Sequence, residues 1–136
     1  MLNKIPKILS PEIVKNLMEM GHGDTILLAD ANFPANTYGK QIIRADGHGT
    51  IELLKAILEL MPLDTYVAKP AKLMKTVKND PQPKIWDEYY KIIDQSNYEE
   101  IERFSFYETS KDCHTIIQTG ETALYGNIIL TKGVIE

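Results

Sequence analysis

Apolar residues recur at helical spacing in three separate stretches of the chain. The first stretch begins at residues 10–12, where a serine N-cap precedes a proline at the first helical position and an acid near the positive end of the helix dipole. Gly21 marks the expected C-terminal stop of this helix. The apolar residues that share its predicted inner face are Ile13, Val14, Leu17 and Met18.

Two further helices follow from the same spacing. Pro62 closes the second, and Pro81 and Pro83 precede the third. Their apolar positions are Ile51, Leu54, Ile57 and Leu58 in the second helix, and Trp86, Tyr89, Tyr90 and Ile93 in the third. Residues three positions apart share a helix face, so we expect Trp86 and Tyr89 in the core rather than on a ligand-binding surface.

Runs of apolar residues between these helices predict strands. The stretch 25–29 is apolar throughout, which is typical of a strand buried on both faces, and it ends at Asp30. Proline, asparagine and glycine within residues 32–40 predict a loop there. Further strands are expected at 41–45, within 66–77, at 101–104, at 114–119 and at 128–130.

The order of these elements predicts the fold class. Ser105 with Glu108 three residues later matches a capping box, so a short helix should follow the strand at 101–104. Strands and helices therefore alternate along the chain. This alternation predicts an α/β fold, a three-layer α/β/α sandwich with helices on both faces of one sheet. A chain of 136 residues favours a single domain, residues 1–136.

Charge and cysteine usage narrow the class of function. The net charge of −4 argues against a nucleic-acid or anionic-membrane partner, because such partners favour a basic face. The chain has no apolar run of about 18 residues, and residues 1–7 lack a signal-peptide pattern, so we expect no membrane span and no signal peptide. Cys113 is the only cysteine, which excludes an internal disulfide and favours a cytoplasmic location.

Two polar residues next to the first predicted strand are candidates for chemistry. His22 lies between Gly21 and Gly23, where little shields an imidazole that can exchange protons near neutral pH; a loop histidine bonded to a nearby carbonyl is the alternative. Asp30 lies at the carboxyl end of the strand, where ligands bind in open α/β sheets, and its carboxylate can accept hydrogen bonds from hydroxyl groups. A turn or N-cap role is the alternative for Asp30.

Other candidates lie near later strand ends. Arg44 precedes Asp46 by two residues, and for this arginine we favour an internal ion pair. Arg103 could hold a hydroxyl or a developing oxyanion, although a solvated surface arginine is the more frequent case. The triplet Tyr125-Gly126-Asn127 offers a phenol, a closely approachable backbone and an amide, with simple turn chemistry as the alternative.

Several common chemistries leave no trace in the sequence. His48, His114 and Cys113 do not have the spacing of a zinc site, so we expect no metal. Cys113 and His114 are neighbours on a predicted strand and would point to opposite faces, which disfavours a thiol nucleophile. The nucleotide-binding and hydrolase motifs GxGxxG, P-loop and GxSxG are also absent.

Nine blocks along nearly the whole chain resemble the L-fucose mutarotase family, the sister family of the D-ribose pyranases. The order and spacing of the blocks make the resemblance specific, whereas residues 67–98 match poorly. The blocks are 8–12, 20–24, Asp30, 33–35, 43–47, 103–104 with 106–108, 119–121, 125–128 and 132–134.

The resemblance implies a ribose pyranase-like fold and an isomerase that interconverts the α and β anomers of free L-fucose without a cofactor. By position, it implies that His22 is the acid–base group and that Tyr125 could be a second proton relay. It assigns sugar binding to Asp30, Arg103 and the triplet of Tyr125, Gly126 and Asn127. Family members form ring-shaped homo-oligomers, commonly decamers, with sites at subunit contacts.

Two alternatives stay open at this point. A D-ribose pyranase shares the histidine, the aspartate and a Tyr-x-Asn triplet, although pyranases usually have histidine where this chain has Arg103. A non-catalytic sugar-binding subunit of a transport system could use the same hydroxyl-binding groups.

Overall fold

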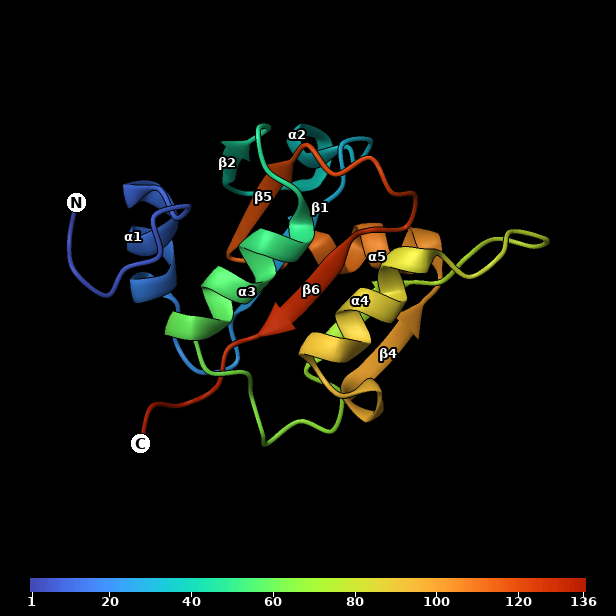
Figure 1. Cartoon of the computed structure of the whole chain (residues 1–136). Helices are drawn as coiled ribbons and strands as arrows, with labels where there is room; N and C mark the ends of the chain where they lie inside the picture. Colours follow the sequence, from blue (N-terminus) through green and yellow to red (C-terminus); the bar gives the residue numbers. More distant parts are fainter.

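The computed structural model describes residues 1–136 and contains one six-stranded sheet with helices on both faces (Figure 1). The strands are β1 (Thr25–Ala29), β2 (Ile42–Ala45), β3 (Ala71–Met74), β4 (Tyr98–Ile101), β5 (Thr115–Thr119) and β6 (Ile128–Thr131). The helices are α1 (Pro11–Glu19), α2 (Ala35–Tyr38), α3 (Thr50–Leu60), α4 (Lys84–Ile92), α5 (Arg103–Ser110) and the 3₁₀ turn η1 (Gln95–Asn97).

All strands except β6 run in the same direction. The strand order is β2-β5-β1-β6-β3-β4, with β6 antiparallel to its neighbours β1 and β3 and all other pairs parallel. Five strands therefore end, and β6 begins, at the same end of the sheet, which we call the carboxyl end. The opposite end, where β1 begins and β6 finishes, is called the amino end.

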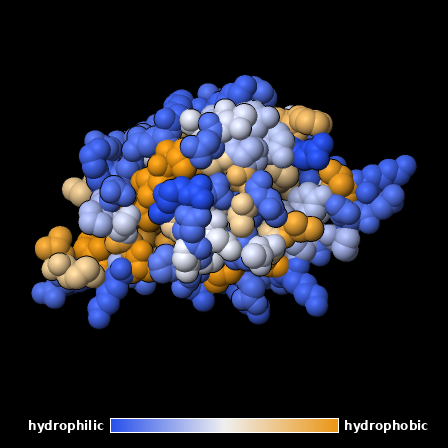
Figure 2. Space-filling view, turned by 90° about the horizontal axis from the view of Figure 1, so that it is seen from above, coloured by the Kyte–Doolittle hydropathy of each residue, from blue (hydrophilic) through white to orange (hydrophobic).

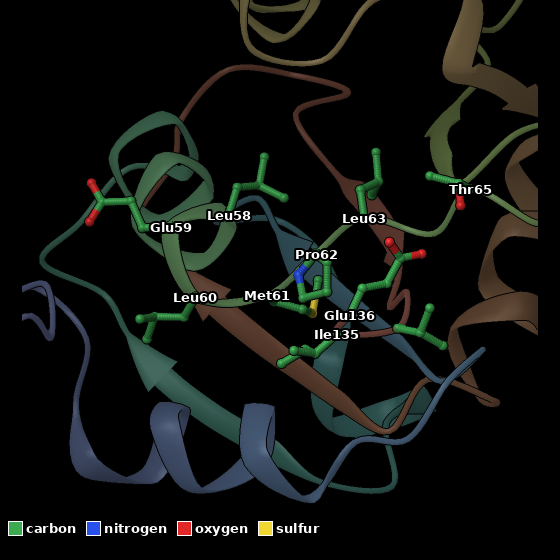
Figure 3. A pocket seen from close by; sticks show the side chains of 10 residues that line it. Leu58, Glu59, Leu60, Met61, Pro62, Leu63, Thr65, Ile135 and Glu136 are labelled. Carbon is green, nitrogen blue, oxygen red and sulfur yellow. The ribbon is translucent and has the colours of Figure 1, made fainter.

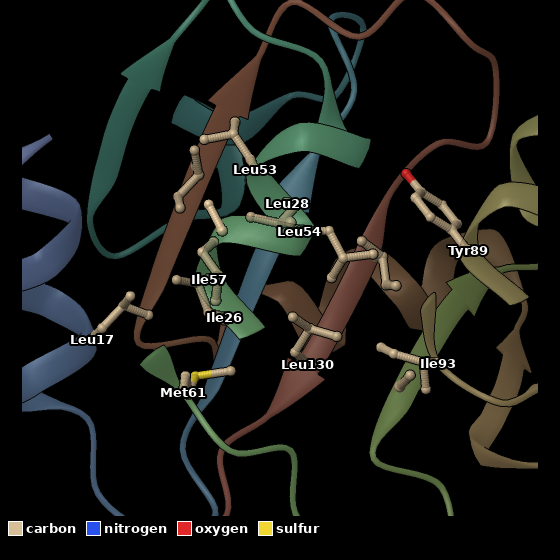
Figure 4. Packing of buried hydrophobic residues seen from close by; sticks show 14 of the residues in the cluster. Leu17, Ile26, Leu28, Leu53, Leu54, Ile57, Met61, Tyr89, Ile93 and Leu130 are labelled. Atoms are coloured by element: carbon tan, nitrogen blue, oxygen red, sulfur yellow. The ribbon is translucent and has the colours of Figure 1, made fainter. Parts of the chain in front are cut away.

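Strand alternation divides the core into two clusters. In β1, Ile26 and Leu28 belong to a cluster of 21 buried residues that includes side chains of α1, α3 and α4 (Figure 4). Leu27 and Ala29 belong to a second cluster of 9 buried residues that is covered by α2 and α5. Because successive strand residues point to opposite faces, β1 is apolar at every position after Thr25. The predicted three-layer sandwich is confirmed.

The first helix is confirmed, but its predicted apolar face was too wide. The Ser10 side chain accepts a hydrogen bond from the Ile13 N–H at 3.2 Å, as expected of an N-cap. Ile13 and Leu17 are buried, whereas Met18 is 81% exposed. Figure 1 shows α1 beside the sheet, and only Ile13, Asn16 and Leu17 of this helix are buried.

The prediction for residues 101–104 was wrong. The strand there is Tyr98–Ile101, and α5 already begins at Arg103. Ser105 is not the N-cap: Glu102 has that role, and its carboxylate accepts from the Ser105 N–H at 3.0 Å. The predicted loop 32–40 also contains the one-turn helix α2, a segment too short for helical spacing to reveal.

The remaining predicted helices and strands are confirmed with small shifts of their ends. The strand expected within 66–77 starts directly after Pro70, which accepts a main-chain hydrogen bond from the Thr131 N–H at 2.8 Å. No helix is both long and apolar enough to cross a membrane. Figure 2 shows hydrophilic atoms over much of one side of the molecule, with apolar atoms gathered toward the end where α1 lies.

Candidate functional site

A cavity of about 180 Å³ opens at the carboxyl end of the sheet. Four of the residues predicted to bind a ligand line it: Asp30, Arg103, Tyr125 and Asn127. They come from three connections: Asp30 follows β1, Arg103 follows β4, and Tyr125 and Asn127 both precede β6, whose reversed direction brings them to this end. The other lining residues are Asn32, Phe33, Met74, Tyr107 and Leu124, so the cavity has a polar side and an apolar, partly aromatic side.

Asp30 and Asn127 hold each other through two hydrogen bonds. The Asp30 N–H donates to Asn127 Oδ1 at 2.7 Å, and Asn127 Nδ2 donates to Asp30 Oδ2 at 3.1 Å. The first bond fixes which end of the amide faces the carboxylate. Asp30 Oδ1 also accepts from the Asn32 N–H at 3.0 Å. The carboxylate is therefore held in one orientation while it faces the cavity.

Burial is the largest influence on the pKa of Asp30. The residue is 5% exposed, and desolvation raises the pKa of its carboxyl above the usual range. Hydrogen bonds from the main-chain N–H groups of Asn32, Gly126 and Phe33 and from Asn127 oppose this shift without cancelling it. A buried carboxylate with remaining acceptor capacity is suited to ligand hydroxyl groups, which would replace the lost water.

The triplet 125–127 is fixed by helix α4. Tyr125 has the left-handed backbone angle φ 58°, which is unfavourable for a residue with a side chain. Trp86 Nε1 donates to the Tyr125 carbonyl at 2.9 Å, and the Tyr89 hydroxyl donates to the Gly126 carbonyl. A Cβ at Gly126 would lie 3.0 Å from the Ala123 carbonyl oxygen, so this close approach favours glycine.

Trp86 and Tyr89 are in the core, as predicted, with 2% and 0% exposure. Their hydrogen bonds to the triplet were not foreseen. Helical spacing predicts that the two side chains are buried, but it contains no information about which loop their polar atoms reach. The Thr50 hydroxyl lies 2.6 Å from the Tyr89 hydroxyl and extends this support to the start of α3.

Arg103 lies in the cavity wall at the start of α5, not at a strand end as predicted. Its guanidinium stacks on the Phe104 ring, with 4.6 Å between Cζ and the ring centroid. The Tyr125 hydroxyl donates to the Asp80 carboxylate and accepts from the Val77 N–H at 3.3 Å. The hydrogen bond to Asp80 raises the pKa of the Tyr125 phenol.

His22 lies at the amino end of the sheet, outside this cavity. It precedes β1, whereas Asp30 follows it, and a five-residue strand spans about 16 Å at ~3.3 Å per residue. The Gly23 N–H donates to the Lys132 carbonyl at 2.9 Å, which ties the histidine turn to the end of β6. Within one chain, the structure therefore does not bring His22 together with Asp30, Arg103 or Tyr125.

Asp64 is the partner of His22. His22 Nε2 lies 2.9 Å from Asp64 Oδ1, and the side chains are 44% and 1% exposed, respectively. Burial acts to raise the pKa of Asp64, but hydrogen bonds from the Val67 N–H, His22 and the Tyr66 N–H outweigh it and lower the pKa. Asp64 orients the imidazole, since donation from Nε2 makes Nδ1 the basic nitrogen of the neutral ring. Nothing in the sequence pairs two residues 42 positions apart.

Other parts of the chain offer less chemistry. A larger cavity of about 530 Å³ lies where the end of α3 meets the C-terminal residues, and it is lined mostly by apolar side chains such as Leu58 and Ile135 (Figure 3). The ion pair expected for Arg44 is present, with Nε 2.9 Å from Asp46 Oδ1. No group of three or more His, Cys, Asp or Glu side chains could hold a metal ion.

The fold and the cavity define a class: a mixed α/β sandwich with a small cavity, lined by polar and apolar side chains, at the carboxyl ends of its strands. The model of the RbsD / FucU transport protein family matches residues 3–135. The chain belongs to this family, which confirms the resemblance seen in the sequence.

Relatives of known structure and name agree with this assignment. The fucose mutarotase of Homo sapiens is 48% identical over 98% of this chain and 94% of its own length. The fucose mutarotase of Streptococcus pneumoniae, crystallised in complex with L-fucose, is 48% identical, with a TM-score of 0.97 over 99% of this chain and 100% of the other. RbsD of Bacillus subtilis, complexed with D-ribose, is 23% identical with a TM-score of 0.76 over 94% and 95% of the two chains, and this likeness shows the fold alone.

Proposed function

We propose that this chain is an L-fucose mutarotase, an isomerase that interconverts the α and β anomers of free L-fucose. The observation that carries the proposal is the cavity at the carboxyl end, where a buried carboxylate, an amide and a guanidinium face apolar and aromatic side chains. Hydroxyl groups on one side of a hexose and its C–H groups on the other match such a cavity. The near-complete coverage of relatives named fucose mutarotase supports the same substrate.

The proposed sugar contacts follow from hydrogen-bonding capacity. Asp30 accepts from sugar hydroxyls, and Arg103 donates from a rigid fork that can hold two acceptors. Asn127 keeps the Asp30 carboxylate in place, and Gly126 adds to this support through a main-chain hydrogen bond to the same carboxylate. Phe33 and Tyr107 supply the aromatic wall on which the apolar face of the ring packs.

The reaction itself needs only proton transfers. Opening the hemiacetal removes a proton from the anomeric hydroxyl and delivers one to the ring oxygen, and closure on the other carbonyl face reverses both transfers. We assign acid–base catalysis to His22, because a positioned imidazole supplies both protonation states near neutral pH. No electron or group is transferred, so the proposal requires no cofactor and no metal.

The distance between His22 and Asp30 implies that the working enzyme is a homo-oligomer. In the proposed arrangement, His22 of one copy faces the cavity of another. Leu124 in the cavity wall and Phe104, which stacks on Arg103, are 64% and 62% exposed, and Tyr66, 5.1 Å from the His22 ring, is 74% exposed. Burying these side chains between copies would remove apolar surface from water. The family resemblance makes a decamer the expected assembly.

We further propose that residues 1–136 form a single domain that works in the cytoplasm, without a nucleic-acid or membrane partner. Both apolar clusters pack on one sheet, which supports a single domain. The only thiol, Cys113, is buried, and burial raises its pKa to about 11. A lone, inert thiol suits a reducing compartment.

Saturation-transfer NMR on free L-fucose and D-ribose, with and without protein, tests the proposal. We expect the protein to accelerate exchange between the L-fucose anomers. Acceleration for ribose but not for fucose would identify a pyranase instead. Binding of fucose with an unchanged exchange rate would identify a non-catalytic sugar-binding protein.

A further inference from the structure

The connection between β3 and α4 contains a hydrogen-bonded turn beside the cavity. It projects away from the body of the molecule in Figure 1, and Figure 2 shows hydrophilic atoms on this projection. The Lys75 N–H donates to the Ile101 carbonyl at 2.7 Å and anchors the base of the connection. The Asp80 N–H donates to the Val77 carbonyl at 3.1 Å, and Asn79 between them has φ 75°. Residues 77–80 thus form a hydrogen-bonded turn with a left-handed residue.

Both ends of this turn contact the phenol of Tyr125. The Tyr125 hydroxyl donates to the Asp80 carboxylate, and the Val77 N–H donates to the Tyr125 hydroxyl oxygen at 3.3 Å. The main chain of Tyr125 is held independently, since Trp86 donates to its carbonyl. The phenol is therefore fixed at both its backbone and its hydroxyl.

The hydrogen bonds that the Tyr125 hydroxyl already makes decide which ones it can still form with a sugar. A phenol has one O–H donor, and its oxygen can also accept hydrogen bonds. In Tyr125, the donor is engaged by Asp80, and the oxygen accepts from the Val77 N–H at 3.3 Å. Tyr125 lines the cavity, and with its donor engaged its oxygen can meet a ligand hydroxyl only as an acceptor.

We propose that Asp80 is a positioning residue that fixes the Tyr125 phenol as a hydrogen-bond acceptor toward one hydroxyl of the bound sugar. This inference rests on the proposed function. Tyr125 then orients the sugar and does not protonate the ring oxygen, which differs from the second proton relay suggested by family resemblance. The raised pKa of the Tyr125 phenol agrees with this geometry, because an O–H group that donates to a carboxylate loses its proton less readily.

Removal of Asp80 should act through Tyr125 alone. Without the carboxylate, the phenol hydrogen is free to turn toward the sugar, and the acceptor position is lost in part of the molecules. We expect Asp80→Ala to raise the Kd and the KM for L-fucose about three- to tenfold, as for the loss of one hydrogen bond. The kcat should fall less than twofold, because the proton-transferring group is untouched.

A double-mutant cycle tests this route. Calorimetric titration of L-fucose into the parent, Asp80→Ala, Tyr125→Phe and the double variant gives the coupling, and NMR exchange gives kcat and KM for the same four proteins. We expect Asp80→Ala to weaken binding in the parent but to have no further effect when Tyr125 is phenylalanine. Asp80→Asn should restore most of the affinity, because its amide oxygen can still accept from the phenol. Asp87→Asn removes the same charge from an exposed position on α4 and should bind like the parent.

Three results would overturn the proposal. The first is an equal loss of affinity from Asp80→Ala in the tyrosine and phenylalanine backgrounds. The second is an asparagine variant no better than alanine, and the third is a loss with Asp87→Asn as large as that with Asp80→Ala. A parent protein that binds L-fucose without exchanging its anomers would contradict only the proposed function, and the binding cycle would still decide the role of Asp80. A parent that does not bind L-fucose would contradict both.

Discussion

The two ends of the sheet hold different parts of the proposed catalytic machinery. At the carboxyl end, Asp30 is 5% exposed and is locked by reciprocal hydrogen bonds to Asn127. At the amino end, His22 is 44% exposed and is held by one hydrogen bond to a buried Asp64. In the proposed mechanism, the carboxyl end orients a sugar within one chain, whereas His22 at the amino end acts only where it faces the cavity of another copy. Binding and catalysis should therefore respond separately to substitution.

The largest expected effect is on catalysis at the amino end. His22→Gln should lower the rate of L-fucose anomer exchange by roughly 10²–10⁴-fold, the usual contribution of a positioned acid–base group. The Kd for L-fucose should change little, since the carboxyl end is untouched. Saturation-transfer NMR and calorimetry measure the two quantities on the same sample. An exchange rate equal to that of the parent would remove His22 from the mechanism.

The preference for L-fucose over D-ribose should depend on Arg103 at the carboxyl end. Arg103→His replaces a rigid fork of donors by a shorter side chain, as at the corresponding position of the pyranases. A polar ligand group left without a partner costs about 1–3 kcal/mol, so fucose turnover should fall roughly tenfold while ribose turnover falls less. Exchange rates for both sugars on parent and variant give the ratio. An unchanged fucose-to-ribose ratio would mean that Arg103 does not set specificity.

Loss of a hydrogen bond from α4 to the cavity wall should have a smaller effect, on both stability and L-fucose binding. Tyr89→Phe removes the donor to the Gly126 carbonyl and should lower the unfolding free energy by about 1–3 kcal/mol while also weakening L-fucose binding a few-fold. Tyr98→Phe is a matched control: its buried hydroxyl donates to the Tyr89 carbonyl at 2.8 Å, and we expect lost stability with normal affinity. Denaturant unfolding and calorimetry separate the two. If Tyr89→Phe binds L-fucose as tightly as Tyr98→Phe does, Tyr89 contributes to stability and not to sugar binding.

The smallest expected effect is on the pH dependence of stability, where the two ends have opposite signs. The pKa of Asp30 is raised from its ordinary value of 3.8 in the folded protein, so its contribution lowers stability as pH rises from about 3.8 through the raised value. The pKa of Asp64 is lowered, so its contribution is present above 3.8 and is lost as pH falls through the lowered value. Measured as a function of pH, the unfolding free energy of Asp30→Asn should lack the fall that the parent shows above about pH 3.8. That of Asp64→Asn should lack the fall that the parent shows below this pH. The same change in both variants would contradict these signs.

Local sequence patterns predicted most of the fold because the strands and helices carry clear periodicity. Asp30 could be placed at the carboxyl end of a strand, since it directly follows an apolar strand. Arg103 was assigned to the wrong element, because the glutamate before it caps the helix in place of the expected Ser105. Helical spacing did predict that Trp86 and Tyr89 are buried.

The site depends on relations that no local pattern contains. The reversed direction of β6 brings Asn127 to the end of β1, and it follows from pairing across the sheet. The pairing of His22 with Asp64 and of Tyr125 with Asp80 spans 42 and 45 positions, respectively. The separation of His22 from the cavity also follows only from the three-dimensional arrangement.

Co-expression of two inactive variants tests the central claim that each active site combines residues of two copies. His22→Gln keeps an intact carboxyl end, and Asp30→Asn keeps an intact amino end. Mixed oligomers, purified through two different tags, should recover about a quarter of the parental exchange rate, because random pairing joins two intact halves at about one site in four. Mixed oligomers as inactive as either variant alone would contradict the claim, because they would place the acid–base group and the sugar-binding residues within one chain.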